Sequence, residues 1–272
     1  MHRKFIFLII FFISTIPFCA FSQSGKITYD AVINRSLPGV PKDEMFQDDL
    51  YCNGWLFFNG SESIYRQSLP DSAVTSRSGG GSEGVLRMRY PIKVADTIGS
   101  IYKIQHQNKK ILARMPLFNL KDFYVVDDKL EPINWKIETE KKRIGKFEVI
   151  KANADYLGRN WTAWFAPEIP VSVGPWKLYG LPGLILEAED STRKFRFLLK
   201  EVQVPFQINS AIFNPAALTK TAISKTEFIK IEEKKKDDQY RFRKARMEAA
   251  AGPDSRPVKI NINFEETIEI YK

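Results

Sequence analysis

Short stretches in which apolar and polar residues alternate dominate this chain. Every second position of residues 25–34 is apolar, which is the period of a half-buried β-strand. These positions are Ile27, Tyr29, Ala31 and Ile33. Residues 50–67 contain two apolar runs on either side of Asn59-Gly60, and Asn-Gly in that setting is a strong hairpin signal. The beginning of the chain therefore predicts antiparallel strands joined by tight turns.

The same spacing continues through the middle of the chain, where turn signals recur about every eight to twelve residues, as in an antiparallel meander. The expected strands are residues 101–106, 111–115, 122–126, 133–137, 147–154, 161–165, 184–188 and 194–202. We expect turns at Asp127-Asp128 and at residues 157–160, and a solvated loop at the Gly/Ser-rich residues 76–84. Strands do not alternate with helices, which argues against a parallel α/β sheet.

One long helix is expected near the C-terminus, at residues 224–251. Ser224 and Glu227 have the spacing of a capping box, in which each side chain satisfies a free backbone N–H group. Phe228 and Ile231 can pack inward, whereas most of the remaining helix is charged and should be solvated. Gly252-Pro253 would end it, and residues 258–271 alternate again as one or two strands. The predicted fold class is mainly β: a strongly curved antiparallel sheet, half-barrel or bowl-like, with one long helix.

The N-terminus resembles a secretory signal peptide at residues 1–22. Arg3 and Lys4 precede an apolar run at residues 5–18, which is short for a membrane span. Small residues favour cleavage before Gln23. The alternative is a retained membrane anchor. We expect an exported protein, periplasmic or secreted, whose residues 23–272 form a single β-rich domain.

The charge and the cysteine content limit which classes of partner and which disulfides we expect. The formal net charge is +9, but the basic residues of the predicted helix are mixed with acids, and an exported protein is a poor partner for nucleic acid. Membrane association should be weak at most. Only Cys52 remains after cleavage, so the mature chain can form no internal disulfide.

Residue types that support catalysis are scarce. His106 is the only histidine after residue 22, and zinc sites need several His or Cys ligands. No Gly-x-Ser-x-Gly sequence presents a serine, and the carboxylate pairs lie at expected turns or strand ends. We therefore assign no catalytic residue, no metal site and no cofactor. His106 is expected to be a partly exposed strand residue, and Cys52 a small buried one.

Residues 174–187, called here the Gly/Pro segment, combine three glycines and two prolines with an apolar and aromatic run. Leu181-Pro182-Gly183-Leu184 is typical of a type II turn, with a positive φ at Gly183. Gly180 would allow a close approach of the backbone.

Four tryptophans lie on predicted strands or in the Gly/Pro segment and could line an apolar ligand face; packing in the core is the alternative. They are Trp135, Trp161, Trp164 and Trp176. Trp161 and Trp164 should project from opposite faces of one strand.

The Gly/Pro segment resembles the signature of the GLPGLI family, exported Bacteroidota proteins without an established activity. The signature residues are Gly174, Pro175, Gly180, Leu181, Pro182, Gly183, Leu184 and Ile185. Residues 144–170 also resemble the family's approach to the signature, although Val149-Ile150 stand where members often have a cysteine. The resemblance implies an exported, bowl-like curved sheet, akin to an accessory module of some secreted glycoamidases. It transfers no catalytic residue.

Three functions are compatible with these features. The first is an exported envelope binding or accessory protein without catalytic activity, which holds an apolar or peptide ligand or docks an outer-membrane transporter. The second is an envelope peptide or glycan hydrolase that uses carboxylates, or Cys52 with His106. The third is a purely structural envelope protein.

Overall fold

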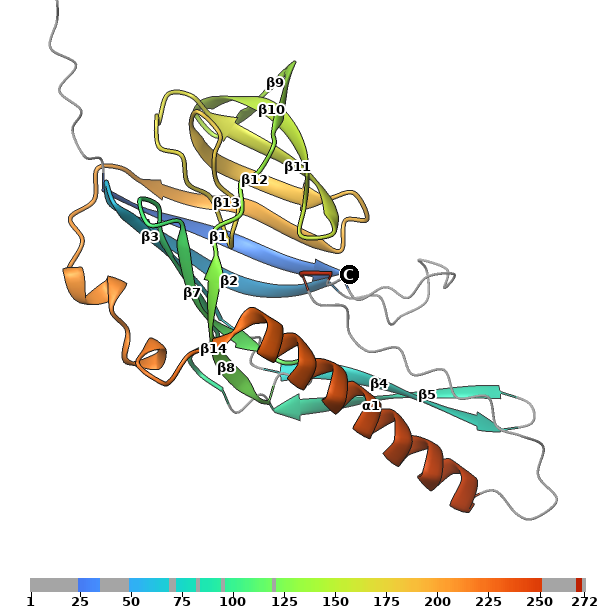
Figure 1. Cartoon of the computed structure of the whole chain (residues 1–272). Helices are drawn as coiled ribbons and strands as arrows, with labels where there is room; N and C mark the ends of the chain where they lie inside the picture. The colour runs from blue at the N-terminus through green and yellow to red at the C-terminus, as the bar shows by residue number, and fades with distance from the viewer. Residues whose placement is uncertain are drawn as a thin grey trace, which may run out of the picture.

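A computed structural model describes residues 24–34, 49–68, 72–81, 84–93, 96–118, 121–250 and 268–270. One twelve-stranded sheet dominates it, and Figure 1 shows that this sheet is strongly curved, with a long helix projecting from it. Its first six strands along the chain are β1 (Gly25–Asn34), β2 (Asp49–Phe58), β3 (Glu62–Gln67), β6 (Ser100–Gln105), β7 (Lys110–Pro116) and β8 (Phe123–Lys129). The others are β9 (Lys136–Ile144), β10 (Phe147–Tyr156), β11 (Arg159–Ala166), β12 (Leu184–Asp190), β13 (Phe195–Gln203) and β14 (Ile223–Ser224).

The sheet is open and almost entirely antiparallel. Its strand order is β14-β8-β7-β6-β3-β2-β1-β13-β12-β11-β10-β9, and only β14 pairs in parallel, with β8. Strand β1 joins the two halves, since it pairs with β2 on one side and β13 on the other. The predicted fold class, mainly β with a curved antiparallel sheet and one long helix near the C-terminus, is confirmed.

Local sequence explains the hairpin between β2 and β3. The side-chain oxygen of Asn59 accepts hydrogen bonds from the backbone N–H groups of Ser61 and Glu62, each at 2.9 Å. Asparagine side chains stabilise such turns by this bonding to their own backbone. The predicted turn at Asn59-Gly60 is therefore confirmed.

Two predictions about the sheet are wrong, and one expected strand differs in its bounds. The described part of the loop predicted at residues 76–84, which is residues 76–81 and Gly84, lies in strands, because β4 (Ser72–Gly81) and β5 (Gly84–Lys93) pair as a separate two-stranded sheet. Backbone hydrogen bonds between strands do not depend on apolar side chains. Asp127-Asp128 do not form a turn, since both lie within β8. Of the strand expected at residues 133–137, only Lys136 and Ile137 lie in a strand, and β9 continues to Ile144 through mostly charged residues, as is common in edge strands.

The main hydrophobic core spans the inner face of the curved sheet, from β1 to β13, and includes Phe228 of the helix. A smaller cluster covers the other face of β3, β6 and β8. It consists of Ile64, Ile101, Val125, Phe213 and Leu218. Phe213 and Leu218 come from two short 3₁₀ helices, η1 (Ser210–Phe213) and η2 (Ala216–Leu218). This half of the sheet is consequently covered on both faces.

Helix α1 (Lys225–Ala250) begins where the sequence predicts. Ser224 caps it by accepting a hydrogen bond from the N–H of Glu227 at 3.2 Å. Phe228 is buried against Tyr124, whereas Phe242 is 68% exposed. No described helix is long and apolar enough to cross a membrane.

Several predictions fall partly or wholly outside the described residues. These concern the signal peptide at residues 1–22, the helix stop at Gly252-Pro253, and most of residues 258–271. Within the last range, residues 268–270 are described and form no strand. The single domain at residues 23–272 and the exported location stay predictions.

Candidate functional site

The Gly/Pro segment begins in the loop between β11 and β12 and ends within β12. Its backbone folds on itself, since the N–H of Leu178 donates to the carbonyl of Pro175 at 3.0 Å and Val173 forms a bridge with Tyr179. Trp176, Lys177 and Leu178 are each at most 1% exposed. The loop is therefore an interior part of the fold and not a surface excursion.

The two key glycines have the opposite roles from those predicted. Gly180 has a φ of +96°, and a Cβ there would meet only Trp135 at 3.7 Å, an ordinary contact distance. Gly183 has no positive φ, and a Cβ there would run into the carbonyl oxygen of Ala166. The type II turn with a positive φ at Gly183 is therefore wrong. Gly180 supplies the left-handed backbone and Gly183 the close approach.

Trp176 fixes the loop to the core through its ring. Its φ of +55° is unusual for a large side chain, so the surrounding packing must hold it. The ring lies 5.4 Å from Trp161 and 6.0 Å from Tyr156, measured between ring centroids. Trp161 also stacks on Phe197 at 6.1 Å. The sheet's inner face is thus filled, at this point, by the chain's own aromatic side chains.

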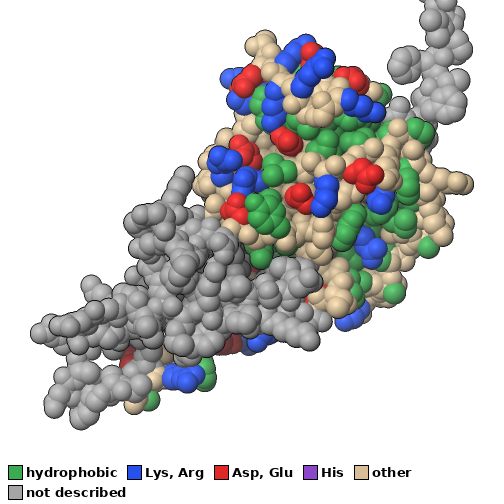
Figure 2. Space-filling view, turned by 180° about the vertical axis from the view of Figure 1, so that it is seen from behind, with side chains coloured by type: hydrophobic (Ala, Val, Ile, Leu, Met, Phe, Trp, Pro, Cys, Tyr) green, Lys and Arg blue, Asp and Glu red, His purple; other side chains and the backbone are tan. Residues whose placement is uncertain are grey.

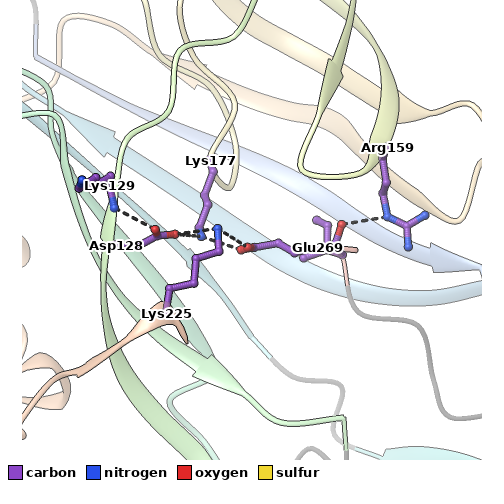
Figure 3. A network of polar contacts seen from close by, with 7 residues as sticks. Asp128, Lys129, Arg159, Lys177, Lys225 and Glu269 are labelled. Atoms are coloured by element: carbon purple, nitrogen blue, oxygen red, sulfur yellow. Dashed lines mark hydrogen bonds and ion pairs between the residues drawn. The ribbon is translucent and has the colours of Figure 1, made fainter. Parts of the chain in front are cut away.

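Next to Trp176, Lys177 enters a cluster of four charges, which we call the charge cluster: Asp128, Lys177, Lys225 and Glu269. The ammonium of Lys177 lies 3.1 Å from an oxygen of Asp128 and 2.6 Å from an oxygen of Glu269. Lys225 approaches the same two carboxylates at 3.2 and 3.4 Å. Figure 3 shows the four side chains converging from separate parts of the chain: β8, the Gly/Pro segment, the start of α1 and the C-terminal residues.

The charge cluster balances two cations with two carboxylates in the interior. Lys177 and Glu269 are each 1% exposed, so neither charge would be tolerated there alone. Burial alone would raise the pKa of Asp128, but Lys177 and Lys225 lower it below its usual value. Burial alone would lower the pKa of Lys225, but Glu269 and Asp128 raise it. Both pKa shifts favour the charged forms, as expected where cations and carboxylates neutralise one another.

The C-terminal residues 268–270 reach the charge cluster through specific contacts. The guanidinium of Arg159 donates to the carbonyl of Ile268 at 2.9 Å, and the N–H of Ile270 donates to the carbonyl of Leu157 at 3.0 Å. Gly158 permits this approach, because a Cβ there would come within 2.6 Å of Ile270. Burial, and then the charge of Glu269, raises the pKa values of Tyr102 and Tyr156. Both phenols are thus neutral neighbours of that carboxylate.

The four tryptophans proposed for a ligand face divide into two pairs. Trp161 and Trp176 are buried in the core, at 0% and 1% exposure. Trp135 is half-buried and donates its indole N–H to the carbonyl of Tyr179 at 2.7 Å, which anchors the Gly/Pro segment. Trp164 is half-buried on the face of β11 opposite Trp161. Whether any of them contacts a ligand stays a prediction.

Trp164 lies in a mixed charged surface on β9 to β12, which we call the Trp164 face. Lys142 and Lys151 place their ammonium groups 4.4 and 5.9 Å from the centre of its ring. Lys142 also pairs with Glu187 at 2.6 Å. Figure 2 shows basic, acidic and hydrophobic side chains intermixed over the described surface when the molecule is seen from behind.

Cys52 and His106 lack the exposure and the thiol pKa of a catalytic cysteine–histidine pair. Cys52 is buried, as predicted, and burial raises the pKa of its thiol to about 11, so the thiol stays protonated at neutral pH. His106 lies in the turn after β6 and not in a strand, and its Nε2 is 3.0 Å from the hydroxyl oxygen of Ser63. Burial lowers the pKa of His106. The described residues contain no group of three or more His, Cys, Asp or Glu side chains that could hold a metal.

Sequence reasoning missed Lys177, Ser63 and Glu269. Lys177 could have been found, because it is a single charge inside the apolar run from Trp176 to Leu178. Its partners could not, since Asp128, Lys225 and Glu269 are distant in sequence and brought together only by the sheet and the helix.

Comparison with known proteins gives a family of unknown function and a distant structural likeness. Residues 158–187 match the family model described as a protein of unknown function (Porph_ging). The comparison with curated proteins found no match. Two crystal structures of PNGF-II, in the P21 and C2 space groups, are similar at 14% and 15% identity, with TM-scores of 0.48 and 0.45. The matches cover 78% and 75% of this chain but only 34% and 31% of those chains, so this chain spans about a third of their length.

Proposed function

We propose that this chain is an exported binding or accessory protein of the cell envelope, without catalytic activity, and a member of the GLPGLI family. The sequence of residues 1–22 supports export, and the Gly/Pro segment supports the family. The family model of unknown function overlaps that segment, since it ends at residue 187.

The burial, charge pairing and protonation state of the potentially reactive side chains support a function without catalysis. The charge cluster neutralises itself in the interior, and the thiol of Cys52 is held protonated by burial. A catalytic group must reach substrate in a reactive protonation state, whereas Cys52 is buried with its thiol protonated and the four charged side chains pair with one another. The chemistry-bearing residues therefore hold the fold together.

The Trp164 face is the best candidate for a contact surface. It combines a half-buried indole with flexible cations and a carboxylate, side chains that suit a peptide or protein partner. Tryptophan often anchors interfaces, because it buries a large apolar area and loses little conformational freedom. A peptide ligand or an outer-membrane transporter would meet the protein there.

The test is capture of the partner through a photo-crosslinking side chain at the neighbouring Thr162. The native host should secrete the protein with Gln23 as its first residue, which N-terminal sequencing of the exported fraction checks. The Trp164→Ala variant should lose at least about tenfold of the crosslinked partner at a temperature where both proteins are folded. Tyr51→Ala is the matched control, since Tyr51 is a 63% exposed aromatic on β2. Equal capture by both variants would contradict the proposal.

A hydrolase remains the second candidate because of one contact, the 3.0 Å between Ser63 and His106. The lowered pKa keeps His106 neutral near pH 7, as a general base requires. Ser63 is only 3% exposed, which opposes attack on a substrate. A fluorophosphonate probe should leave the wild-type protein unlabelled; labelling that disappears in Ser63→Ala would establish the hydrolase instead.

A further inference from the structure

The second half of helix α1 differs from the first half in its charge. Residues 239–250 contain four cations and one acid, a net charge of +3, whereas residues 226–238 contain four lysines and five acids. The first half packs on the sheet through Phe228, and from there α1 runs away from the twelve-stranded sheet (Figure 1). The positive charge of α1 therefore lies on the part of the helix that projects.

One face of this projecting half neutralises its own charges. Arg241 lies 2.8 Å from Asp237, and Lys244 lies 3.9 Å from Glu248, each pair four residues apart. At about 3.6 residues per turn, these four positions follow one line along the helix. This face consequently presents little net charge to a partner.

The opposite face combines an exposed aromatic ring with two unpaired arginines. Phe242, Arg243 and Arg246 share this face, because residues three and four apart in a helix are neighbours. Phe242 is 68% exposed, and both arginines are exposed. Neither arginine is paired with an acid in the part of the chain that the structure describes. We call these three residues the Phe242 face.

The Phe242 face has the chemistry that an anionic lipid surface recognises. Guanidinium groups bind phosphate oxygens through two parallel N–H donors, and phenylalanine enters the boundary between head groups and acyl chains. A convex strip on a projecting helix can meet a plane of head groups without a complementary groove. We propose that the Phe242 face binds an anionic lipid surface and holds the protein against a membrane.

This contact is peripheral and reversible. No described helix is able to cross a membrane. Lipid-binding basic clusters usually contain about four to eight cations, and even one myristoyl chain gives only marginal attachment. Two free arginines and one aromatic ring therefore bind and release rapidly. The inference does not depend on the function proposed above, because the Trp164 face lies on strands β9 to β12 and not on α1.

The experiment measures cosedimentation of the full mature chain, residues 23–272, with lipid vesicles. Vesicles of about 30% phosphatidylglycerol in phosphatidylcholine are compared with pure phosphatidylcholine. We expect saturable binding to the anionic vesicles that is at least about tenfold tighter, and that weakens when the salt rises from about 50 to about 500 mM. Equal binding to both kinds of vesicle, or no binding, would overturn the proposal.

Two double variants that remove the same charge locate the contact. Arg243→Gln with Arg246→Gln should weaken binding about 25-fold, because each basic residue at an anionic surface contributes about fivefold. Arg241→Gln with Lys244→Gln is the matched control on the ion-paired face, and it should weaken binding less than about fivefold. Equal losses would overturn the proposal, since they would mean that net charge alone attracts the protein.

The aromatic ring separates lipid from a soluble polyanion. Phe242→Ala should weaken vesicle binding about tenfold, because the ring no longer leaves water. Tyr240→Ala is its control: Tyr240 is 38% exposed, and it lies about 160° around the helix from Phe242. That variant and Trp164→Ala should bind as the wild-type chain does. Equal binding of Phe242→Ala and Tyr240→Ala would overturn the proposal.

Discussion

At the scale of single residues, the stability of the Gly/Pro segment depends on the close backbone contact at Gly183. Gly183 lies against the backbone of Ala166, so even a methyl group must displace the carbonyl oxygen of a buried residue. Gly145, in contrast, has a positive φ with nothing near its missing Cβ. The comparison separates steric crowding from backbone strain.

We expect Gly183→Ala to lower the free energy of unfolding by about 2–4 kcal/mol, because overpacking displaces the backbone between β11 and β12. Gly145→Ala should cost about 1 kcal/mol, from its left-handed conformation alone. Urea denaturation followed by tryptophan fluorescence measures both. Equal losses in the two variants would mean that crowding at Ala166 is relieved by small shifts.

His106 should make stability depend on pH. Burial lowers its pKa in the folded protein below the ordinary 6.5, so the unfolded chain takes up the proton first as the pH falls. The stability that neutral His106 contributes is therefore present above about pH 6.5 and lost as the pH falls through its folded pKa. Urea denaturation at pH 7.5 and 5.0 should show a larger loss for the wild-type chain than for His106→Gln. Identical losses would show that His106 titrates normally.

At the scale of elements, the contacts of α1 with the described part of the sheet come from its first turns. Phe228 packs on Tyr124 of β8 at 6.1 Å between ring centroids, and the ion pair of Lys235 with Asp122 lies two turns further along. Phe242 in the second half is exposed. The helix therefore divides into a docked beginning and a solvated end, as its charge pattern predicts.

Truncating the two phenylalanines of α1 should reveal this division. Phe228→Ala should cost about 3–5 kcal/mol of unfolding free energy, because it leaves a cavity in the main core. Phe242→Ala should change it by less than about 0.5 kcal/mol. The melting temperatures of the two variants measure the difference. A large loss in Phe242→Ala would indicate that the second half of α1 packs against something.

At the scale of the whole molecule, the charge cluster ties together segments that are far apart in sequence. Lys177 joins the Gly/Pro segment to β8 and to the C-terminal residues, while Lys225 joins the start of α1 to the same carboxylates. Each carboxylate lies within 3.4 Å of both cations, so the four segments meet at one point.

Removing one cation should destabilise the whole fold. Lys177→Met removes the buried cation that contacts both Asp128 and Glu269, and breaking a buried ion pair typically costs about 3–5 kcal/mol. Lys200→Met is the control, since Lys200 forms an exposed pair with Asp30 that should contribute at most about 1 kcal/mol. Calorimetric melting of both variants is the measurement. A Lys177→Met protein as stable as the control would show that methionine packing replaces the pair.

The sequence by itself determined the elements whose signals are local. Alternation over residues 25–34, the Asn59-Gly60 hairpin and the Ser224 cap depend on neighbours within a few residues, so their structure could be predicted. Most of strand β9 and the pairing of β4 with β5 could not be predicted, because charged and glycine-rich residues lack an apolar period and form strands only when another backbone pairs with them.

Tertiary structure alone decided the chemistry of the interior. The sequence predicts a turn at Asp127-Asp128, whereas in the structure Asp128 lies in β8 and pairs with Lys177. It predicts Gly183 as a turn residue with a positive φ, whereas in the structure Gly183 packs against the backbone of Ala166 in β11. Lys177, Lys225 and Glu269 are ordinary charges in the sequence and become a buried, neutralised cluster only where four distant segments meet. Burial and charge pairing depend on distances in space, which hydrophobic periodicity along the chain does not encode.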